Sequence, residues 1–174
     1  ESQRKDLDGI YISGGEPLKH EGVVSFLQYA KTLNYKIKIH TNGMFYERLK
    51  TILAQKLVDH VSLDIKNAPS AYAKTCGVED MDLKDIEKSL DLLKQSVVPY
   101  DICVTLVDEL HNQETIEELG EWLQGVDTVI LQPFEDSETT IDHSLHRPSF
   151  EVVLKYKNIF EKYVKHVKIR GDQA

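Results

Sequence analysis

Short runs rich in isoleucine, valine and tyrosine recur along the chain, and longer segments of mixed polar and apolar residues separate them. Runs of this length and composition, bounded by turn residues, predict β-strands. The predicted strands are residues 9–13, 36–40, 60–65, 101–107, 128–132 and 166–170.

The segments between these runs carry apolar residues at the spacing of one helix face, which predicts a helix after each of the first five strands. Asp82 is placed to cap the third helix, and Pro148 lies just ahead of the last, where a helix can begin. The apolar stripes are Val23, Leu27 and Ala30; Tyr46, Leu49, Ile52 and Leu53; Leu83, Ile86, Leu90 and Leu93; Ile116, Leu119, Leu123 and Val126; and Val152, Tyr156, Ile159 and Tyr163.

A strand followed by a helix, five times over and closed by a further strand, predicts parallel strands joined by right-handed crossovers. We therefore expect an α/β fold in one domain spanning residues 1–174. An open doubly wound sheet and an arc of a (β/α) barrel both fit, because periodicity does not separate them. In both architectures ligands bind at the carboxyl ends of the strands, so the chemistry is expected in the residues that follow each strand.

The chain has 174 residues, with 29 acidic against 21 basic side chains and a formal net charge of -8. This charge repels a nucleic-acid backbone or an anionic membrane surface, so we expect neither as a partner. The sequence has no apolar stretch long enough to span a bilayer, and its start lacks the pattern of a secretory signal. These features predict a cytoplasmic protein.

The first predicted strand is followed by two glycines, Gly14 and Gly15, and then by Glu16 and Pro17. Adjacent glycines permit unusual backbone dihedrals and leave main-chain N–H and C=O groups open to a ligand. Glu16 adds a carboxylate that can receive an ammonium group. The alternative is a tight strand-to-helix turn with a solvated glutamate, because short glycine motifs have many false positives.

The following strands also end in polar residues. Residues 41–43, Thr-Asn-Gly, follow the second strand, although Asn-Gly is also a common turn. Asp64 and Lys66 leave the third strand on one face, which indicates either a polar cavity or a simple ion pair at its rim. Thr105 lies near the end of the fourth strand and Gln132 near the end of the fifth. A single ligand at the strand ends would contact all of these positions.

The order of these motifs resembles the S-adenosylmethionine-binding half of the radical SAM superfamily. The motifs are Ile12-Ser13-Gly14-Gly15-Glu16-Pro17, Thr41-Asn42-Gly43 and Asp64-Ile65-Lys66. Later segments resemble activating proteins of anaerobic ribonucleoside-triphosphate reductases, a group similar to pyruvate formate-lyase activating enzymes. These segments are residues 64–69 with Tyr72, Thr75-Cys76-Gly77, Leu131-Gln132-Pro133-Phe134 with Thr139 and Thr140, and Val167-Lys168-Ile169-Arg170-Gly171. The similarity runs from about Leu7 to Gly171.

The resemblance implies a partial (β/α) barrel with a 4Fe-4S cluster that holds S-adenosylmethionine (SAM) at one open iron. Reduction of the cluster, by reduced flavodoxin or ferredoxin, cleaves SAM to methionine and a 5′-deoxyadenosyl radical, which abstracts a hydrogen from a glycine of the partner enzyme. The implied partner is an anaerobic ribonucleoside-triphosphate reductase. The alternatives are a glycyl-radical enzyme of the pyruvate formate-lyase type, a non-catalytic SAM-binding module, and an α/β domain in which the motifs are coincidental turns.

The resemblance also assigns residues to the cofactor. The Gly-Gly-Glu segment would bind the methionine amino group, and the Thr-Asn pair would line the adjacent part of the same pocket. The Lys66 ammonium suits the carboxylate of SAM. The implied cofactor-binding residues are Gly14, Gly15, Glu16, Thr41, Asn42, Asp64, Lys66, Thr105 and Gln132.

The chain departs from the family at two points. His40 stands where relatives often carry an acidic residue, and the signature Cys-x-x-x-Cys-x-x-Cys is absent. Three thiolates hold three irons of such a cluster, and Cys76 and Cys103 lack that spacing, so we expect structural thiols, buried or half-buried. We therefore expect a chain that is incomplete at its N-terminus, lacks the first strand and the cluster loop, and has no catalytic or metal-binding residue. His111 can touch a ribose, but we expect an ordinary loop histidine.

Overall fold

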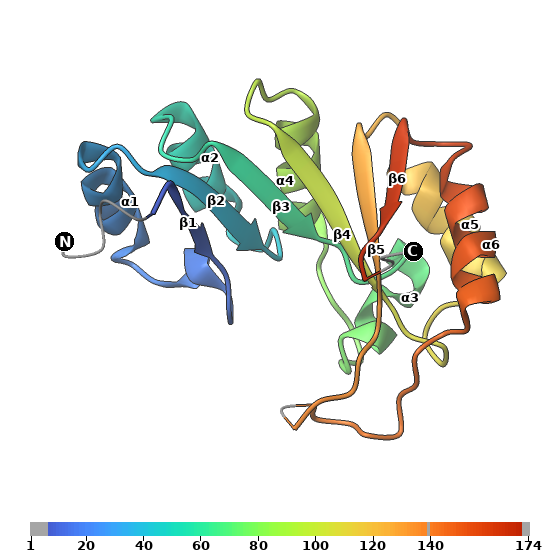
Figure 1. Cartoon of the computed structure of the whole chain (residues 1–174). Coiled ribbons are helices and arrows are strands. Elements are labelled where there is room, and N and C mark those ends of the chain that lie inside the picture. Colours follow the sequence, from blue (N-terminus) through green and yellow to red (C-terminus); the bar gives the residue numbers. More distant parts are fainter. Residues whose placement is uncertain (1–6, 139, 172–174) are drawn as a thin grey trace. The chain divides into compact units, whose positions relative to one another are not determined.

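The structure, a computed structural model, describes residues 7–138 and 140–171 (Figure 1). Its residues form two compact units, each described below by itself. We call Glu1–Asp64 with Leu83–Tyr100 the N-unit, and Ile65–Asp82 with Asp101–Ala174 the C-unit. Thr139, part of the resemblance to the reductase-activating proteins, lies outside the described residues. The single domain expected from the sequence stays a prediction.

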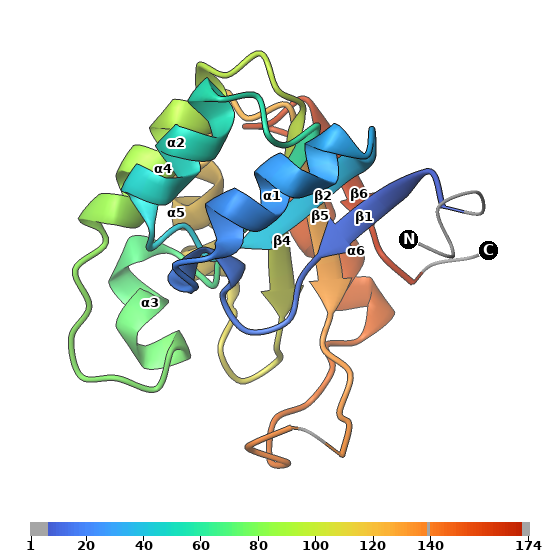
Figure 2. The same cartoon turned by 90° about the vertical axis from the view of Figure 1, so that its left-hand side faces the viewer.

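The N-unit contains three parallel strands. β1 (Gly9–Ile12) pairs with β2 (Lys36–Thr41), and β2 pairs with β3 (His60–Asp64). The 3-10 helix η1 and three α-helices complete the unit, and α2 and α4 lie side by side (Figure 2). These helices are η1 (Pro17–Lys19), α1 (Val23–Thr32), α2 (Tyr46–Ala54) and α4 (Lys84–Lys94).

One face of the N-unit strands is apolar and buried. In β2, Ile37 and Ile39 are buried, whereas Lys38 and His40 between them are only partly so. Successive side chains of a strand point to opposite faces, so this alternation shows that one face of β2 is covered, whereas Val61 and Ser62 show that β3 is buried on both faces. Burial of each such aliphatic side chain contributes about 1.5–3 kcal/mol to folding. Leu27, Leu49, Ile52, Leu63, Ile86 and Leu90 supply the rest of this core.

The C-unit repeats the same arrangement. β4 (Tyr100–Leu106), of which Tyr100 belongs to the N-unit, pairs in parallel with β5 (Thr128–Pro133), and β5 pairs with β6 (His166–Ile169). Helix α5 contacts both α3 and α6, which Figure 1 shows with the C-unit strands. These helices are α3 (Pro69–Thr75), α5 (Gln113–Trp122) and α6 (Phe150–Phe160).

Local side-chain contacts define where the C-unit helices begin. Asn112 and Thr115 form a capping box at α5, with each side chain bonded to the backbone of the other residue. The Ser149 hydroxyl accepts a hydrogen bond from the Val152 N–H at the start of α6. Each cap satisfies backbone donors that a helix leaves without an internal partner, and contributes about 1 kcal/mol. The expected start of the last helix, just after Pro148, is confirmed.

The predicted strands and helices are all present, and no strand end is shifted by more than one residue. Other details were wrong or missed. The 3-10 helix η1 was not predicted. Four residues expected on helix stripes lie just outside α4, α5 and α6, namely Leu83, Leu123, Val126 and Tyr163. Helix α3 was not predicted, because only Tyr72 of its seven residues is buried and no apolar stripe marks it. Asp82 does not cap α4, since Leu83 occupies the cap position and no side chain bonds there.

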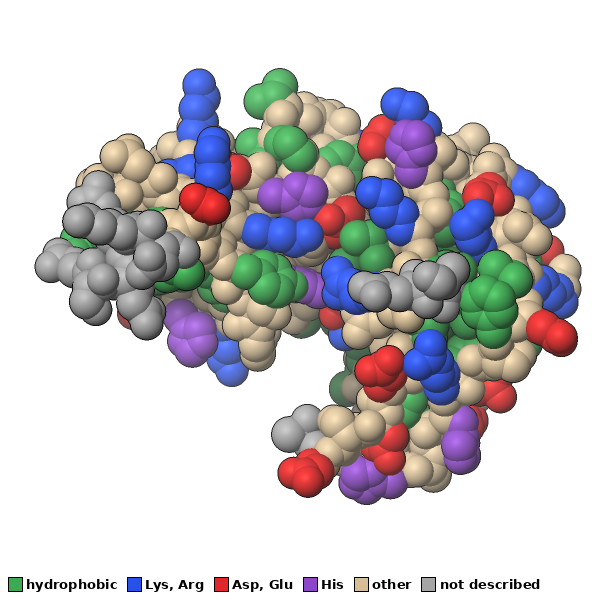
Figure 3. Space-filling model, viewed as in Figure 1, with side chains coloured by type: hydrophobic (Ala, Val, Ile, Leu, Met, Phe, Trp, Pro, Cys, Tyr) green, Lys and Arg blue, Asp and Glu red, His purple; other side chains and the backbone are tan. Residues whose placement is uncertain are grey.

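Charged side chains of both signs are intermixed on the face of the molecule shown in Figure 3. Several form ion pairs, such as Arg147 with Glu135 at 3.1 Å. Among residues 7–138 and 140–171, none of the helices has the length and apolar character that crossing a membrane requires.

Candidate functional site

The turn that follows β1 in the N-unit has an open backbone. Gly14 has a φ of 89°, in the left-handed region that favours glycine. A Cβ atom built on Gly14 or on Gly15 would meet no heavy atom within 4 Å, and Ser13 beside them is exposed. The main-chain groups of this turn are therefore accessible to a ligand, as the glycine pair predicts.

The Glu16 carboxylate that follows is not a free solvated group. Its Oε1 accepts hydrogen bonds from the Leu18 N–H at 2.9 Å and the Thr41 hydroxyl at 2.8 Å, and its Oε2 accepts one from the Asn42 N–H at 2.7 Å. The alternative is therefore correct in its turn from strand to helix, because Glu16 caps η1, and wrong in its solvated glutamate. A carboxylate has about four acceptor positions, so Glu16 joins the exits of β1 and β2 and keeps one position on Oε2.

Residues 41–43 form the second part of this arrangement. Thr41 is buried, and its hydroxyl oxygen also accepts the Gly43 N–H at 3.2 Å. Gly43 has a φ of 79°, and a Cβ there would lie 2.8 Å from the Leu63 side chain. The Ser89 hydroxyl donates to the Gly43 carbonyl at 2.7 Å. The segment is thus a tight turn, as Asn-Gly predicts, and it is also bonded to Glu16, which local sequence does not predict.

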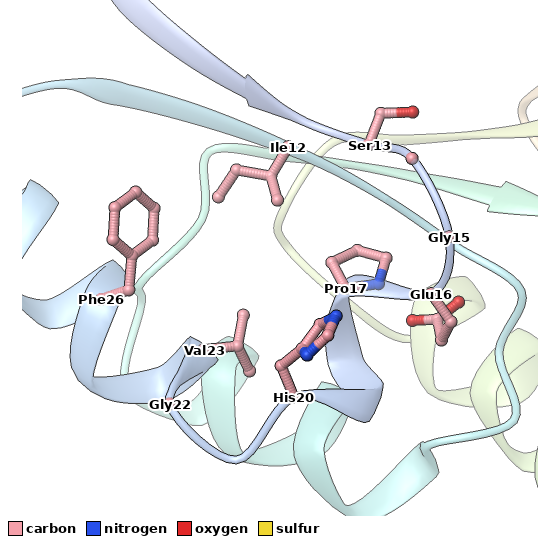
Figure 4. Close-up of a pocket in the computed structure, with 10 residues that line it drawn as sticks. Ile12, Ser13, Gly15, Glu16, Pro17, His20, Gly22, Val23 and Phe26 are labelled. Carbon is pink, nitrogen blue, oxygen red and sulfur yellow. The ribbon is translucent and has the colours of Figure 1, made fainter.

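A cavity of about 410 Å³ lies beside the glycine turn, between the end of β1 and helix α1. Figure 4 shows the apolar side chains of Ile12, Val23 and Phe26 around it, with Glu16 at its edge. Phe26 is 48% exposed. The cavity combines an apolar wall with the open backbone of the glycines.

Asp64 and His40 lie near the ends of their strands in the same unit. Asp64 is the last residue of β3 and is half-buried. His40 is half-buried, and its Nδ1 lies 2.9 Å from the Tyr11 hydroxyl of the neighbouring strand. The residue directly before Thr41 is therefore an imidazole that is bonded to a tyrosine.

The C-unit contains the remaining predicted residues. Thr105 and Gln132 are half-buried register partners in β4 and β5, so they lie next to each other in the sheet. The Gln132 Oε1 accepts a hydrogen bond from the Arg170 guanidinium at 2.8 Å. Lys66 is half-buried, and its backbone carbonyl lies 3.0 Å from the Nε2 atom of His111.

His111 lies in the loop after β4, as expected, but it is buried and not an ordinary loop histidine. The residue is only 4% exposed, and its Nδ1 atom lies 3.1 Å from the Val107 N–H group. Burial lowers the pKa of His111 below its ordinary value, because a charged imidazole loses hydration there. His111 is thus a buried structural group; the apolar residues Val107 and Leu110 beside it were the signal that pointed inward.

Asn67 is a second buried polar residue that sequence reasoning did not single out. Its Nδ2 donates to the Leu110 carbonyl at 2.7 Å and to the Thr75 hydroxyl at 3.0 Å, and its Oδ1 accepts the Ala68 N–H at 2.8 Å. These bonds join the segment after Ile65 to the loop after β4. In this way the Asn67 side chain anchors the segment that follows Lys66 in the C-unit.

The residues present fit SAM better than they fit an iron-sulfur cluster. The open glycine turn and the remaining acceptor position of Glu16 suit an amino-acid ammonium group. In the part of the chain that the structure describes, no group of three or more His, Cys, Asp or Glu side chains is placed to hold a metal ion. Cys103 is buried as expected, but Cys76 is exposed at the end of α3, so the prediction of a buried thiol was wrong there.

Known proteins are similar to this chain in sequence and in fold. A model of the Radical SAM superfamily matches residues 1–124. The chain is 30% identical over 169 residues to a protein of Methanocaldococcus jannaschii named "Putative glycyl-radical enzyme activating enzyme", and the match covers 94% of this chain and 70% of that protein.

Three solved structures have a similar fold. A domain of pyruvate-formate lyase-activating enzyme from Bacteroides vulgatus has a TM-score of 0.72 at 20% identity, over 94% of this chain and 99% of that chain. A radical SAM methyltransferase from Sphaerobacter thermophilus has a TM-score of 0.76 at 16% identity, over 97% and 52%. Streptococcus suis SuiB bound to S-adenosylmethionine has a TM-score of 0.71 at 14% identity, over 95% and 40%. These likenesses confirm the expected α/β fold of parallel strands and helices, of the partial-barrel type found in radical SAM proteins.

Proposed function

Because this chain belongs to the radical SAM superfamily, we propose that it is the SAM-binding part of an enzyme that installs a glycyl radical on a partner enzyme. The observation that carries this proposal is the network at Glu16, which ties the glycine turn after β1 to the Thr41-Asn42 turn after β2. The relative from M. jannaschii, which is similar over 94% of this chain, supports the choice of reaction.

In the N-unit, the backbone of Gly14 and Gly15 and the remaining acceptor position of Glu16 bind the amino group of SAM. An ammonium group donates well to carbonyl and carboxylate oxygens, and such charge-assisted bonds are roughly twice as strong as neutral ones. Thr41 and Asn42 line the next part of the pocket, in positions that Glu16 holds. Asp64 orients the polar end of the cofactor.

In the C-unit, the Lys66 ammonium binds the carboxylate of SAM, and Thr105 and Gln132 are further cofactor-binding residues. The pairing of Thr105 with Gln132 in the sheet supports a shared role for these two residues. The hydrogen bond from Arg170 orients the Gln132 amide. Each residue here acts by binding and orientation, which is what a protein contributes when a cofactor supplies the reactive chemistry.

The superfamily implies a 4Fe-4S cluster beside SAM, which supplies the electron that cleaves the sulfonium bond. The described residues of this chain do not provide ligands for it. We therefore propose for these residues the binding and orientation of SAM alone, and for the chain by itself no catalytic activity.

We propose an anaerobic ribonucleoside-triphosphate reductase as the partner, because the later motifs resemble its activating proteins. We further propose reduced flavodoxin or ferredoxin as the electron donor and the cytoplasm as the location. A pyruvate formate-lyase type of partner is the alternative. The test is an anaerobic reaction of the protein expressed from its complete gene, reconstituted with iron and sulfide, with each candidate partner, SAM and reductant. The expected result is a glycyl radical on the reductase, detected by electron paramagnetic resonance; a radical on the lyase alone would refute the choice of partner.

Production of 5′-deoxyadenosine in the same reaction tests the activity itself. The Lys66→Ala variant should produce much less than the wild type, and Lys162→Ala, at an exposed position on the surface after α6, is the matched control. No 5′-deoxyadenosine above the background without SAM would contradict the proposed reaction.

A non-catalytic SAM-binding module is the second candidate, because the contacts at Glu16 serve the binding of SAM whether or not SAM is cleaved. Calorimetry separates the two. Binding of SAM by the protein from the complete gene, without any cleavage under reductant, would support the module.

A further inference from the structure

His111 is a buried titratable residue that has no role in the binding of SAM as proposed above. It lies in the loop after β4, yet its imidazole contacts a different segment of the C-unit through the Lys66 carbonyl, at 3.0 Å from Nε2. On the other side of the ring, Nδ1 lies 3.1 Å from both the N–H and the carbonyl of Val107. Its own backbone carbonyl accepts the Tyr156 hydroxyl at 3.0 Å.

These contacts determine one neutral tautomer. Among the residues that the structure describes, the partner of Nε2 is a carbonyl oxygen, which accepts and does not donate, so Nε2 must carry the proton. Nδ1 then has a free lone pair and accepts the Val107 N–H. Burial disfavours the charged imidazole. His111 therefore donates one hydrogen bond to the backbone of Lys66 and accepts one from the backbone of its own loop.

The chain around Lys66 is held at three successive residues, through the backbone at Ile65 and Lys66 and through the side chain at Asn67. The Ile65 N–H donates to the Cys103 carbonyl at 3.0 Å, the Lys66 carbonyl accepts from His111, and Asn67 bonds to the Leu110 carbonyl. A lysine side chain has four rotatable bonds, so its ammonium group is directed only if the backbone that carries it is fixed. The His111 bond is the one of these three that holds the peptide carbonyl of Lys66 itself.

We propose that His111 is a positioning residue for the cofactor site: its neutral imidazole fixes the Lys66 peptide and thereby directs the Lys66 ammonium toward the carboxylate of SAM. This inference rests on the proposed function. His111 does not touch SAM; it acts through Lys66. An apolar side chain of equal size would fill the same volume but leave the Lys66 carbonyl and the Val107 N–H without these partners, which is costly in a buried site.

Two variants separate positioning from packing, because each new side chain keeps the hydrogen bond of one imidazole nitrogen and loses that of the other. In His111→Gln the side-chain amide reaches the position of Nε2 and can still donate to the Lys66 carbonyl. In His111→Asn the shorter side chain reaches only the position of Nδ1. It therefore keeps the hydrogen bond with the Val107 N–H and loses the one to the Lys66 carbonyl. Tyr156→Phe is the matched control, since it removes a buried hydrogen bond to His111 without affecting the bond to Lys66.

The experiment uses the protein expressed from its complete gene and reconstituted with iron and sulfide. Calorimetry gives the affinity for SAM, and thermal unfolding gives the stability. We expect His111→Asn to weaken SAM binding roughly tenfold, the size of effect of one misplaced bond to a charged group. His111→Gln and Tyr156→Phe should bind SAM within about threefold of the wild type, although all three variants unfold at lower temperature. In a Lys66→Ala background, His111→Asn should have no further effect on affinity.

The outcomes distinguish this inference from the proposed function. If the wild type binds SAM but His111→Asn and His111→Gln bind it equally well, the positioning role is refuted and the proposed function stands. If the wild type does not bind SAM, both are refuted. The ¹⁵N shifts of the His111 ring give a further readout without any cofactor: they should show a neutral imidazole protonated at Nε2 at pH 7, and protonation at Nδ1 would overturn the inference.

Discussion

The hydrogen bonds at Glu16 make a quantitative prediction for Glu16→Gln. The carboxylate accepts three hydrogen bonds, two at Oε1 and one at Oε2. A glutamine of the same shape has one oxygen, and its NH₂ group must face at least one of the donors. In the better orientation the amide faces the Asn42 N–H, so that bond is lost and the other two lose the negative charge.

The magnitude follows from these contacts. A hydrogen bond to a charged group contributes about 1.5–3 kcal/mol, and exposure to water reduces that value. Glu16 is half-buried, so we expect a loss of roughly 2 kcal/mol in the free energy of unfolding. For a chain of this size such a loss lowers the melting temperature by about 4–8 °C.

The assay is thermal and urea unfolding followed by circular dichroism. Glu21→Gln is the matched control: Glu21 is exposed in the loop after η1, and a substitution there should change stability by no more than about 0.5 kcal/mol. Thr41→Val tests the mechanism, because Thr41 donates to the same carboxylate. The double variant should lose less than the sum of the two single variants. Equal melting temperatures for Glu16→Gln and Glu21→Gln would refute the reasoning.

Three further predictions concern other parts of the N-unit and C-unit. Gly43→Ala should destabilise the protein by about 1–3 kcal/mol in urea unfolding, because the residue has a positive φ and a Cβ would contact a buried leucine. Gly22→Ala is the control: its φ is -76° and the space around it is open, so the substitution should be nearly neutral. Burial raises the pKa of Asp59, but bonds to two lysines and a backbone N–H outweigh it and lower the pKa to about 2. Its contribution is therefore complete above pH 4 and lost as the pH falls toward 2, so Asp59→Asn should destabilise at pH 7 and hardly at all at pH 2, and a constant loss across this range would contradict the shift. The bond to Glu109 raises the pKa of His146. This contact is therefore strongest below the ordinary histidine pKa and weakens as the pH rises through the raised value. In an NMR titration, Glu109→Gln should return the His146 pKa toward its ordinary value, and an unchanged pKa would refute the pairing.

The fold of this protein was largely predictable from the sequence, because strand and helix periodicity are local properties. Ile37 and Ile39 alternate with polar residues, and Leu119 lies one helical turn from Ile116. Both patterns are independent of distant parts of the chain. Helix α3 escaped prediction since it is short and has one buried side chain. The types of residue at the strand ends were predictable for the same reason: each motif follows its strand directly.

The contacts among those residues depended on the tertiary structure. Glu16 and Thr41 are 25 positions apart, and Lys66 and His111 are 45 apart. Whether two such side chains meet depends on strand pairing and on how the loops pack, and no local pattern contains that information. The sequence by itself determined which chemical groups stand at the carboxyl ends of the strands. Only the tertiary structure decided that Glu16 is a bonded group rather than a solvated one, and that His111 is buried against the backbone of Lys66, because a hydrogen bond requires its donor and acceptor within about 3 Å.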